Sequence, residues 1–110
     1  TLRYKIVEKD FRTCMLYYKM EEYQAAITSF ENFIKDNPTT IHREEIINYM
    51  VRIYAKYAEK SVLLKQRERY ELALEKYNTL MYLYPESQYI AELEPIVEKI
   101  KVELSNIKTK

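Results

Sequence analysis

Glycine and tryptophan are both absent from this 110-residue chain, which has only three prolines, one cysteine and one histidine. A β-rich domain needs glycine at its tight turns, and a phosphate-binding loop needs it where the backbone approaches the ligand. Both classes are therefore disfavoured. One cysteine cannot form an internal disulfide, and with one histidine it leaves a conventional zinc site short of ligands. We expect no metal and no cofactor.

A surplus of charge is lacking as well, since 18 basic and 17 acidic side chains give a formal net charge of +1. Nucleic-acid binders usually carry a basic surplus, because neutralising phosphates supplies much of their affinity. We therefore expect a protein partner and no nucleic acid. No apolar run approaches the roughly 18 residues that a membrane-spanning helix needs.

The single cysteine and the single histidine lie on different predicted helices. Cys14 has apolar neighbours and is predicted to be a small buried thiol, because free cysteines are usually core residues. His42 stands beside Arg43 and Glu44 and is predicted to be a solvated or capping histidine.

What the chain does contain is typical of packed helices: abundant Glu, Lys, Leu, Ile, Ala and Arg. Prolines and short polar clusters divide it into five predicted helices, at about 3–19, 23–35, 41–60, 65–84 and 88–107. Thr39, Thr40 and Ser87 are predicted N-cap residues. Pro95 lies inside the last helix, which should therefore kink or restart there.

The second and fourth predicted helices are copies of each other at an offset of 47 residues. The matched pairs are Tyr23/Tyr70, Ala26/Ala73, Ile27/Leu74, Phe30/Tyr77, Phe33/Leu80, Ile34/Met81, Pro38/Pro85 and Thr40/Ser87. Small, aromatic, aliphatic, proline and capping positions all correspond in type. The sequence therefore contains an internal repeat.

Helix-pair repeats stack so that each pair covers an apolar face of its neighbour. We therefore predict an all-α solenoid of five helices in antiparallel hairpins, a single domain over residues 1–110. Its repeat units would be about 3–38 and 41–85, followed by a capping helix at about 87–107. The packing positions are Tyr23, Ala26, Phe30 and Pro38, with Tyr70, Ala73, Tyr77 and Pro85 in the second copy.

Residues 16–27, LYYKMEEYQAAI, continuing through Phe30 and Phe33 to Pro38, resemble a tetratricopeptide repeat. Paired tyrosines close one helix, and tyrosine, alanine, an aromatic and proline follow at that family's spacing. Glu21 departs from the usual turn glycine, and 47 residues exceed the usual length of about 34. The excess is placed in the third helix and its connection through residues 61–70.

That elongation, with the phrases 57–61 (YAEKS), 65–70 (KQRERY) and 84–89 (YPESQY), resembles BamD-type outer-membrane assembly lipoproteins, in particular those of Bacteroidetes. The resemblance implies a lipid-anchored protein on the periplasmic face of the outer membrane, within the machinery that inserts β-barrel proteins. It also implies docking on the periplasmic domains of the BamA-type barrel subunit. Cys14 does not follow an apolar signal, so the anchor is expected upstream of this sequence.

The first predicted helix is apolar around nearly its whole circumference, which is typical of a helix buried on all sides. The residues concerned are Ile6, Val7, Phe11, Cys14, Met15, Leu16, Tyr17 and Tyr18. We expect a preceding repeat, or a contact with another molecule, to cover them. The alternative is a small apolar patch that water tolerates.

On the third predicted helix, a polar stripe lies opposite the apolar one, and solenoids bind partners on the surface that such helices line. The candidate partner-binding residues are Glu45, Asn48, Tyr49, Arg52, Lys56 and Glu59. The alternative is an ordinary solvated face. The charged run 65–71 likewise reads either as a helix start with compensating charges or as a rim that steers a partner.

Two functions remain open: a non-enzymatic scaffold of outer-membrane β-barrel assembly, and a generic adaptor or co-chaperone with a cytoplasmic location. An enzyme is disfavoured. Carboxylate pairs such as Glu21-Glu22 are adjacent in sequence, so on a helix they diverge and are poorly placed to share a substrate.

Overall fold

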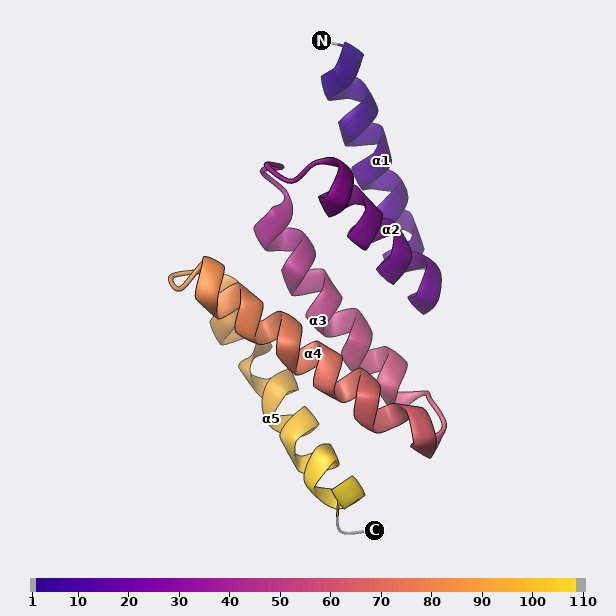
Figure 1. Ribbon diagram of the computed structural model, residues 1–110, viewed down its shortest axis with the longest axis vertical. Helices are drawn as coiled ribbons and strands as arrows, with labels where there is room; N and C mark the ends of the chain where they lie inside the picture. Colours follow the sequence, from indigo (N-terminus) through magenta and orange to yellow (C-terminus); the bar gives the residue numbers. More distant parts are fainter. Residues whose placement is uncertain (1, 109–110) are drawn as a thin grey trace. The chain divides into compact units, whose positions relative to one another are not determined.

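The computed structural model describes residues 2–108, which form five helices (Figure 1). They are α1 (Leu2–Lys19), α2 (Tyr23–Asp36), α3 (Arg43–Glu59), α4 (Leu63–Leu83) and α5 (Gln88–Lys108). No strand occurs within the described residues. The all-α prediction is confirmed, and every helix end lies within two residues of its predicted position.

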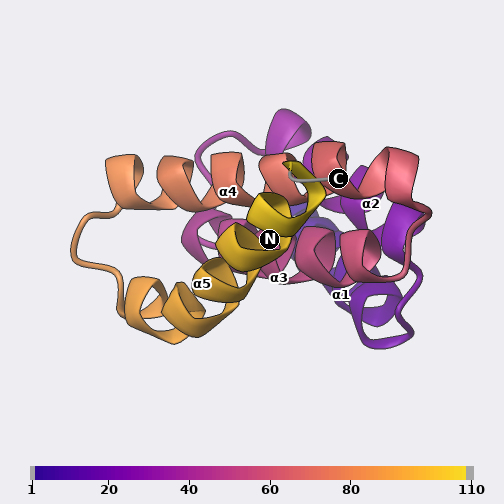
Figure 2. The same ribbon diagram turned by 90° about the horizontal axis from the view of Figure 1, so that it is seen from below.

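The chain divides into two compact units, and the boundary follows Arg43, the first residue of α3. The first unit is the hairpin of α1 and α2, which pack against each other. The second unit contains α3, α4 and α5, and α4 packs on α5 after the turn that joins them (Figure 2). The prediction of a single domain stays a prediction.

The two turns that follow α2 and α4 have the same construction, 47 residues apart. Asn37 ends α2 with φ −135° and ψ 65°, and Tyr84 ends α4 with φ −135° and ψ 68°. Each donates its backbone N–H back to the helix, Asn37 to Phe33 O at 2.9 Å and Tyr84 to Leu80 O at 2.8 Å. The duplication read from side-chain types is therefore also present in the backbone.

The predicted caps follow the same turns. The N–H of His42 donates to Thr40 Oγ1 at 3.1 Å, and the N–H of Tyr89 donates to Ser87 Oγ at 3.2 Å. Ser87 directly precedes α5, as an N-cap residue should. Thr40 makes the corresponding bond, although α3 is continuous only from Arg43.

Most of the predicted packing positions lie in the interior. Ala26, Phe30 and Ala73 are fully buried, and Tyr70 and Tyr77 are buried too. Tyr23 is half-buried, while Pro38 and Pro85 are exposed in their turns. The second unit has one apolar cluster to which all three of its helices contribute: Ile47, Val51, Tyr77, Leu80, Leu93 and Val97.

Part of the excess length of the second repeat lies in α4. Helix α2 begins at Tyr23, but α4 begins at Leu63, seven residues before its matched position Tyr70. Helix α3, with 17 residues, is no longer than α1, with 18. The excess was placed in the third helix and its connection through residues 61–70, and residues 63–69 of that connection instead form the start of α4.

Helix α5 runs through Pro95 without ending, so a restart at that residue was wrong. Proline has no N–H to donate within the helix, and its ring is expected to bend the axis. Three apolar positions, Val97, Ile100 and Leu104, follow Pro95 at helical spacing and are all buried. Their burial favours continuing the helix beyond the proline.

The turn between α1 and α2 is a Schellman motif centred on Glu21. Its φ of 58° is the only positive one among the described residues. The N–H of Glu21 donates to Tyr18 O and that of Glu22 to Tyr17 O, both at 3.1 Å. A left-handed backbone with a Cβ is strained, and glycine avoids that strain. The departure from the family's turn glycine thus leaves strain at Glu21.

Replacing Glu21 by glycine is therefore expected to stabilise the protein. The gain over an alanine at the same position should be about 1 kcal/mol, because alanine retains the Cβ that glycine lacks. Urea denaturation of Glu21→Gly and Glu21→Ala measures this difference directly, since both variants lose the carboxylate. Equal midpoints would show that this turn is unstrained.

Candidate functional site

The candidate face on α3 is formed by residues three or four apart, which share one side of a helix. Glu45, Tyr49 and Arg52 are half-buried, whereas Lys56 and Glu59 are exposed. The Tyr49 hydroxyl donates to Glu45 Oε2 at 3.1 Å. These five residues, named the α3 stripe below, combine an aromatic ring with charges of both signs.

Asn48, the sixth candidate, is only 2% exposed and offers no surface to a partner. Its Oδ1 accepts a hydrogen bond of 3.0 Å from Arg52 Nε. The amide thus fixes the guanidinium of a neighbouring stripe residue. A buried polar group is expected to have such a partner.

Helix α5 borders the α3 stripe. Nothing in the sequence indicated this contact. Arg52 Nη2 donates to Glu92 Oε1 at 3.4 Å, and Lys99 Nζ lies 3.9 Å from Glu59 Oε1. Glu92 and Lys99 lie forty residues beyond their partners, too far for helical periodicity to connect them. All four side chains are largely exposed or half-buried, and such pairs add little stability.

Three carboxylates lie near the Tyr89 hydroxyl, beside the beginning of the stripe. Burial raises the pKa of the Tyr89 hydroxyl, and nearby carboxylates raise it further, whereas the Arg52 guanidinium lowers it. The carboxylates are those of Glu45, Glu44 and Glu92. Arg52 and Lys56 stand further along the helix, and Glu59 follows them, so the basic part of the stripe lies between acidic residues.

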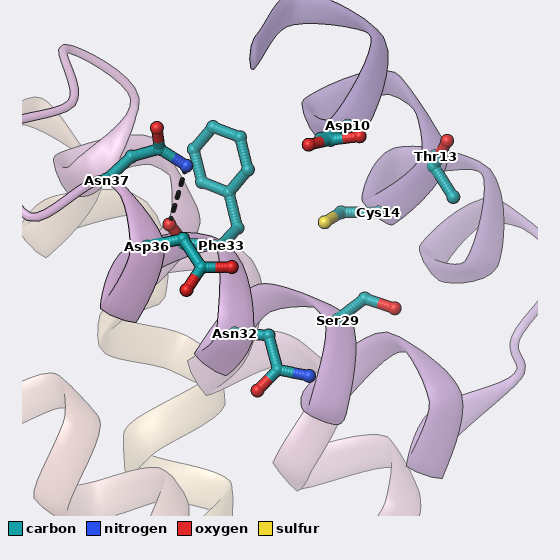
Figure 3. A pocket seen from close by; sticks show the side chains of 8 residues that line it. All are labelled: Asp10, Thr13, Cys14, Ser29, Asn32, Phe33, Asp36 and Asn37. Atoms are coloured by element: carbon teal, nitrogen blue, oxygen red, sulfur yellow. Dashed lines mark hydrogen bonds between the residues drawn. The ribbon is translucent and has the colours of Figure 1, made fainter. Parts of the chain in front are cut away.

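A hollow of about 220 Å³ lies between α1 and α2 (Figure 3). Asp10, Thr13 and Cys14 line it from α1, and the Cys14 thiol points towards α2. The pKa of this thiol is raised to about 11, chiefly by burial and also by the Asp10 carboxylate, while a backbone hydrogen bond acts in the opposite direction. The thiol is therefore protonated at neutral pH and is a weak nucleophile, as predicted for a structural cysteine.

Two other hollows, of about 290 and 350 Å³, surround the matched turns at Pro38 and Pro85. Since both occur at equivalent places in the repeat, turn geometry explains them. No cluster of three metal-binding side chains occurs in the described part of the chain.

His42 was predicted to be a solvated or capping histidine, and its side chain is half-buried rather than solvated. Its ring stacks on Phe11 with centroids 3.9 Å apart and planes 6° apart, and Nε2 lies 2.8 Å from Glu8 Oε1. These contacts join the end of the α2–α3 connection to α1, within the first unit. Glu8 and Phe11 precede His42 by more than thirty residues, so the local sequence carried no signal of them.

The apolar surface of α1 is only partly covered. Cys14 is buried, whereas Val7, Phe11, Met15 and Tyr18 are half-buried. Leu16 and Tyr17 are exposed, and Ile6 lies outside the described side chains. A preceding repeat that covers this face stays a prediction.

The charged run 65–71 is a helical segment of α4 with internal pairing. Arg67 Nε donates to Glu71 Oε1 at 3.1 Å, four residues on. The Arg69 guanidinium lies 3.8 Å above the centre of the Tyr57 ring. The interpretation as a helix start with compensating charges accounts for these contacts.

Among the described residues, none of the helices is long and apolar enough to cross a membrane. No curated protein matches the chain at a significant level. The family model for the outer membrane lipoprotein YfiO matches residues 6–109, nearly the whole chain. This match confirms the resemblance to BamD-type proteins that the repeat, its elongation and its turn phrases indicated. The chain belongs to the YfiO family of outer membrane lipoproteins.

Proposed function

We propose that this chain is a non-enzymatic scaffold of outer-membrane assembly and that it binds the periplasmic domains of a BamA-type barrel subunit. Membership of the outer membrane lipoprotein family is the observation that carries the proposal. The lipid anchor would lie upstream of this sequence and hold the protein on the periplasmic face of the outer membrane.

The α3 stripe is the proposed contact surface. Tyr49 supplies an aromatic ring held by Glu45, and rings of this kind are frequent anchors in protein interfaces. Glu44, Glu45 and Glu92 gather at one end, while Lys56 is exposed towards the other. A partner with complementary charges would thereby be oriented as well as held.

The test is the affinity of the chain for the isolated periplasmic domains of the barrel subunit. Tyr49→Ala combined with Lys56→Glu is expected to weaken binding by about tenfold or more, as loss of an interface anchor does. Lys35→Glu, the same charge reversal at an exposed position of α2, is the control and should leave the affinity unchanged. Arg52 is left intact, because it bonds Asn48 and Glu92 within the chain.

Unchanged affinity in the double variant, with helicity retained, would remove the α3 stripe from the interface. Absence of any binding by the parent chain would favour the alternative, a generic adaptor or co-chaperone with another partner. Affinity capture with the full-length protein from detergent-solubilised membranes would then separate the two functions.

A further inference from the structure

The N-cap of α4 and the first two residues of that helix expose three consecutive aliphatic side chains. Val62 is 69%, Leu63 65% and Leu64 92% exposed. Folded proteins seldom present adjacent aliphatic residues to water at a tip, and exposed apolar patches mark interaction surfaces. We name Val62, Leu63 and Leu64 the aliphatic tip.

Helix capping does not explain these residues. Val62 occupies the N-cap position of α4 and provides no side-chain hydrogen bond, and valine is among the poorest N-cap residues. The next helix, α5, is directly preceded by Ser87, whose hydroxyl does cap it. A residue that breaks a local rule without a structural gain indicates a functional constraint.

Leu63 and Leu64 also belong to the part of α4 that has no counterpart in α2. Residues 63–69 precede Tyr70, the position matched to the start of α2. Neither Leu63 nor Leu64 is buried against the fold, so the extension is not explained by core packing.

Side-chain contacts join the two sides of the base of the tip. Arg69 lies over the Tyr57 ring and donates to Ser61 Oγ, and Ser61 Oγ donates to Tyr57 O. These contacts tie the end of α3 to the first turns of α4. The aliphatic side chains are thus held outward in advance, which lowers the ordering cost of binding.

Exposed lysines border the tip on both sides, Lys60 before it and Lys65 directly after it. Residues 60–69 carry four basic side chains and one acidic one: Lys60, Lys65, Arg67, Arg69 and Glu68. Glu71 partly compensates Arg67, and Glu59, just before this segment, pairs with Lys99. Aliphatic residues flanked by cations suit the interface of an anionic bilayer, where the apolar groups enter and the cations meet headgroups.

We propose that the aliphatic tip inserts into the surface of an anionic phospholipid bilayer, with Lys60 and Lys65 close to the headgroups. This contact is separate from the α3 stripe and from any lipid anchor. It would hold the second unit against the membrane while the stripe binds its protein partner.

Because the chain has no tryptophan, one introduced indole reports on one position. In Leu64→Trp, the tryptophan emission should shift to the blue when phosphatidylglycerol vesicles are added, because the indole leaves water for the bilayer interface. Tyr82→Trp is the matched control, since Tyr82 is on the same helix, 79% exposed and about 27 Å from Leu64 along the axis. Its emission should not change.

Sedimentation with the same vesicles tests the parent residues. Val62→Ser with Leu64→Ser should reduce the bound fraction at least tenfold, because two inserted aliphatic groups are lost. Val62→Ser alone should raise the melting temperature while weakening binding, since serine caps the helix. Opposite changes in stability and binding distinguish lost insertion from unfolding.

Added salt, or phosphatidylcholine in place of phosphatidylglycerol, should weaken binding. Three results would overturn the proposal: no blue shift in Leu64→Trp, equal shifts in both tryptophan variants, or unchanged sedimentation of the double serine variant. A blue shift that needs no vesicles and grows with protein concentration would instead identify a second copy of the chain as the occupant.

Discussion

Phe30→Ala should lower the free energy of unfolding by about 3–5 kcal/mol, the usual cost of removing a large buried aromatic ring. Phe30 is fully buried on α2, and its ring meets Tyr18 edge-on, with centroids 6.5 Å apart. Alanine would leave a cavity that α1 and α2 cannot fill without moving. The loss is a large share of the roughly 5–15 kcal/mol that stabilises a domain of this size.

Urea denaturation measures this effect as a lower midpoint with an unchanged slope. Tyr82→Ala removes another aromatic ring, but from a largely exposed position on α4, and should change stability by no more than about 0.5 kcal/mol. A loss below about 1 kcal/mol in Phe30→Ala would mean that the ring is not in a packed interior.

The second large effect is expected from Leu80→Ala, at about 2–5 kcal/mol. Leu80 is fully buried in the apolar cluster to which α3, α4 and α5 all contribute. Its removal therefore weakens contacts in the whole second unit. Thermal unfolding monitored by circular dichroism should show a lower melting temperature with the helical signal retained at low temperature.

Met81→Ala is the control for Leu80→Ala, because Met81 is the next residue on α4 and is exposed. Similar losses in the two variants would contradict the helical register of α4. Phe33 is the repeat equivalent of Leu80 and is also buried, so Phe33→Ala should be as harmful as Leu80→Ala.

The helices could be predicted from the sequence because their determinants are local. Pro38 and Pro85 end the second and fourth helices, and Ser87 caps the fifth, so each boundary lies within a few residues of its cause. The internal repeat supports the same boundaries, because Pro38 is matched to Pro85 in it. Burial of Ala26 and Ala73 followed from their shared place in that repeat.

The errors concern contacts between distant parts of the chain. His42 was expected to be solvated or capping, but its ring stacks on Phe11 and bonds Glu8, both over thirty residues earlier in the chain. Asn48 was placed on a binding face because it is polar, whereas its burial depends on neighbouring helices. Periodicity gives the face of a helix on which a residue lies, but not which element covers that face.

The candidate site was predictable in outline and not in detail. Helical spacing on α3 collected Glu45, Tyr49 and Lys56 on one side, and the structure keeps them there. The bordering residues Glu92 and Lys99 belong to α5 and make their pairs only in the folded chain. The aliphatic tip had an even weaker signal, since three adjacent apolar residues at a helix start usually enter a core.

Two matched helical hairpin repeats turn their alanines towards the interior, and thiol labelling tests this packing most directly. In a Cys14→Ala background, Ala26→Cys and Ala73→Cys would be treated separately with a maleimide under native conditions, with Tyr82→Cys as the exposed control. Both interior cysteines should react far more slowly than the control and at the control's rate in denaturant, because both alanines are fully buried. Native labelling of either one as fast as Tyr82→Cys would contradict the repeat packing.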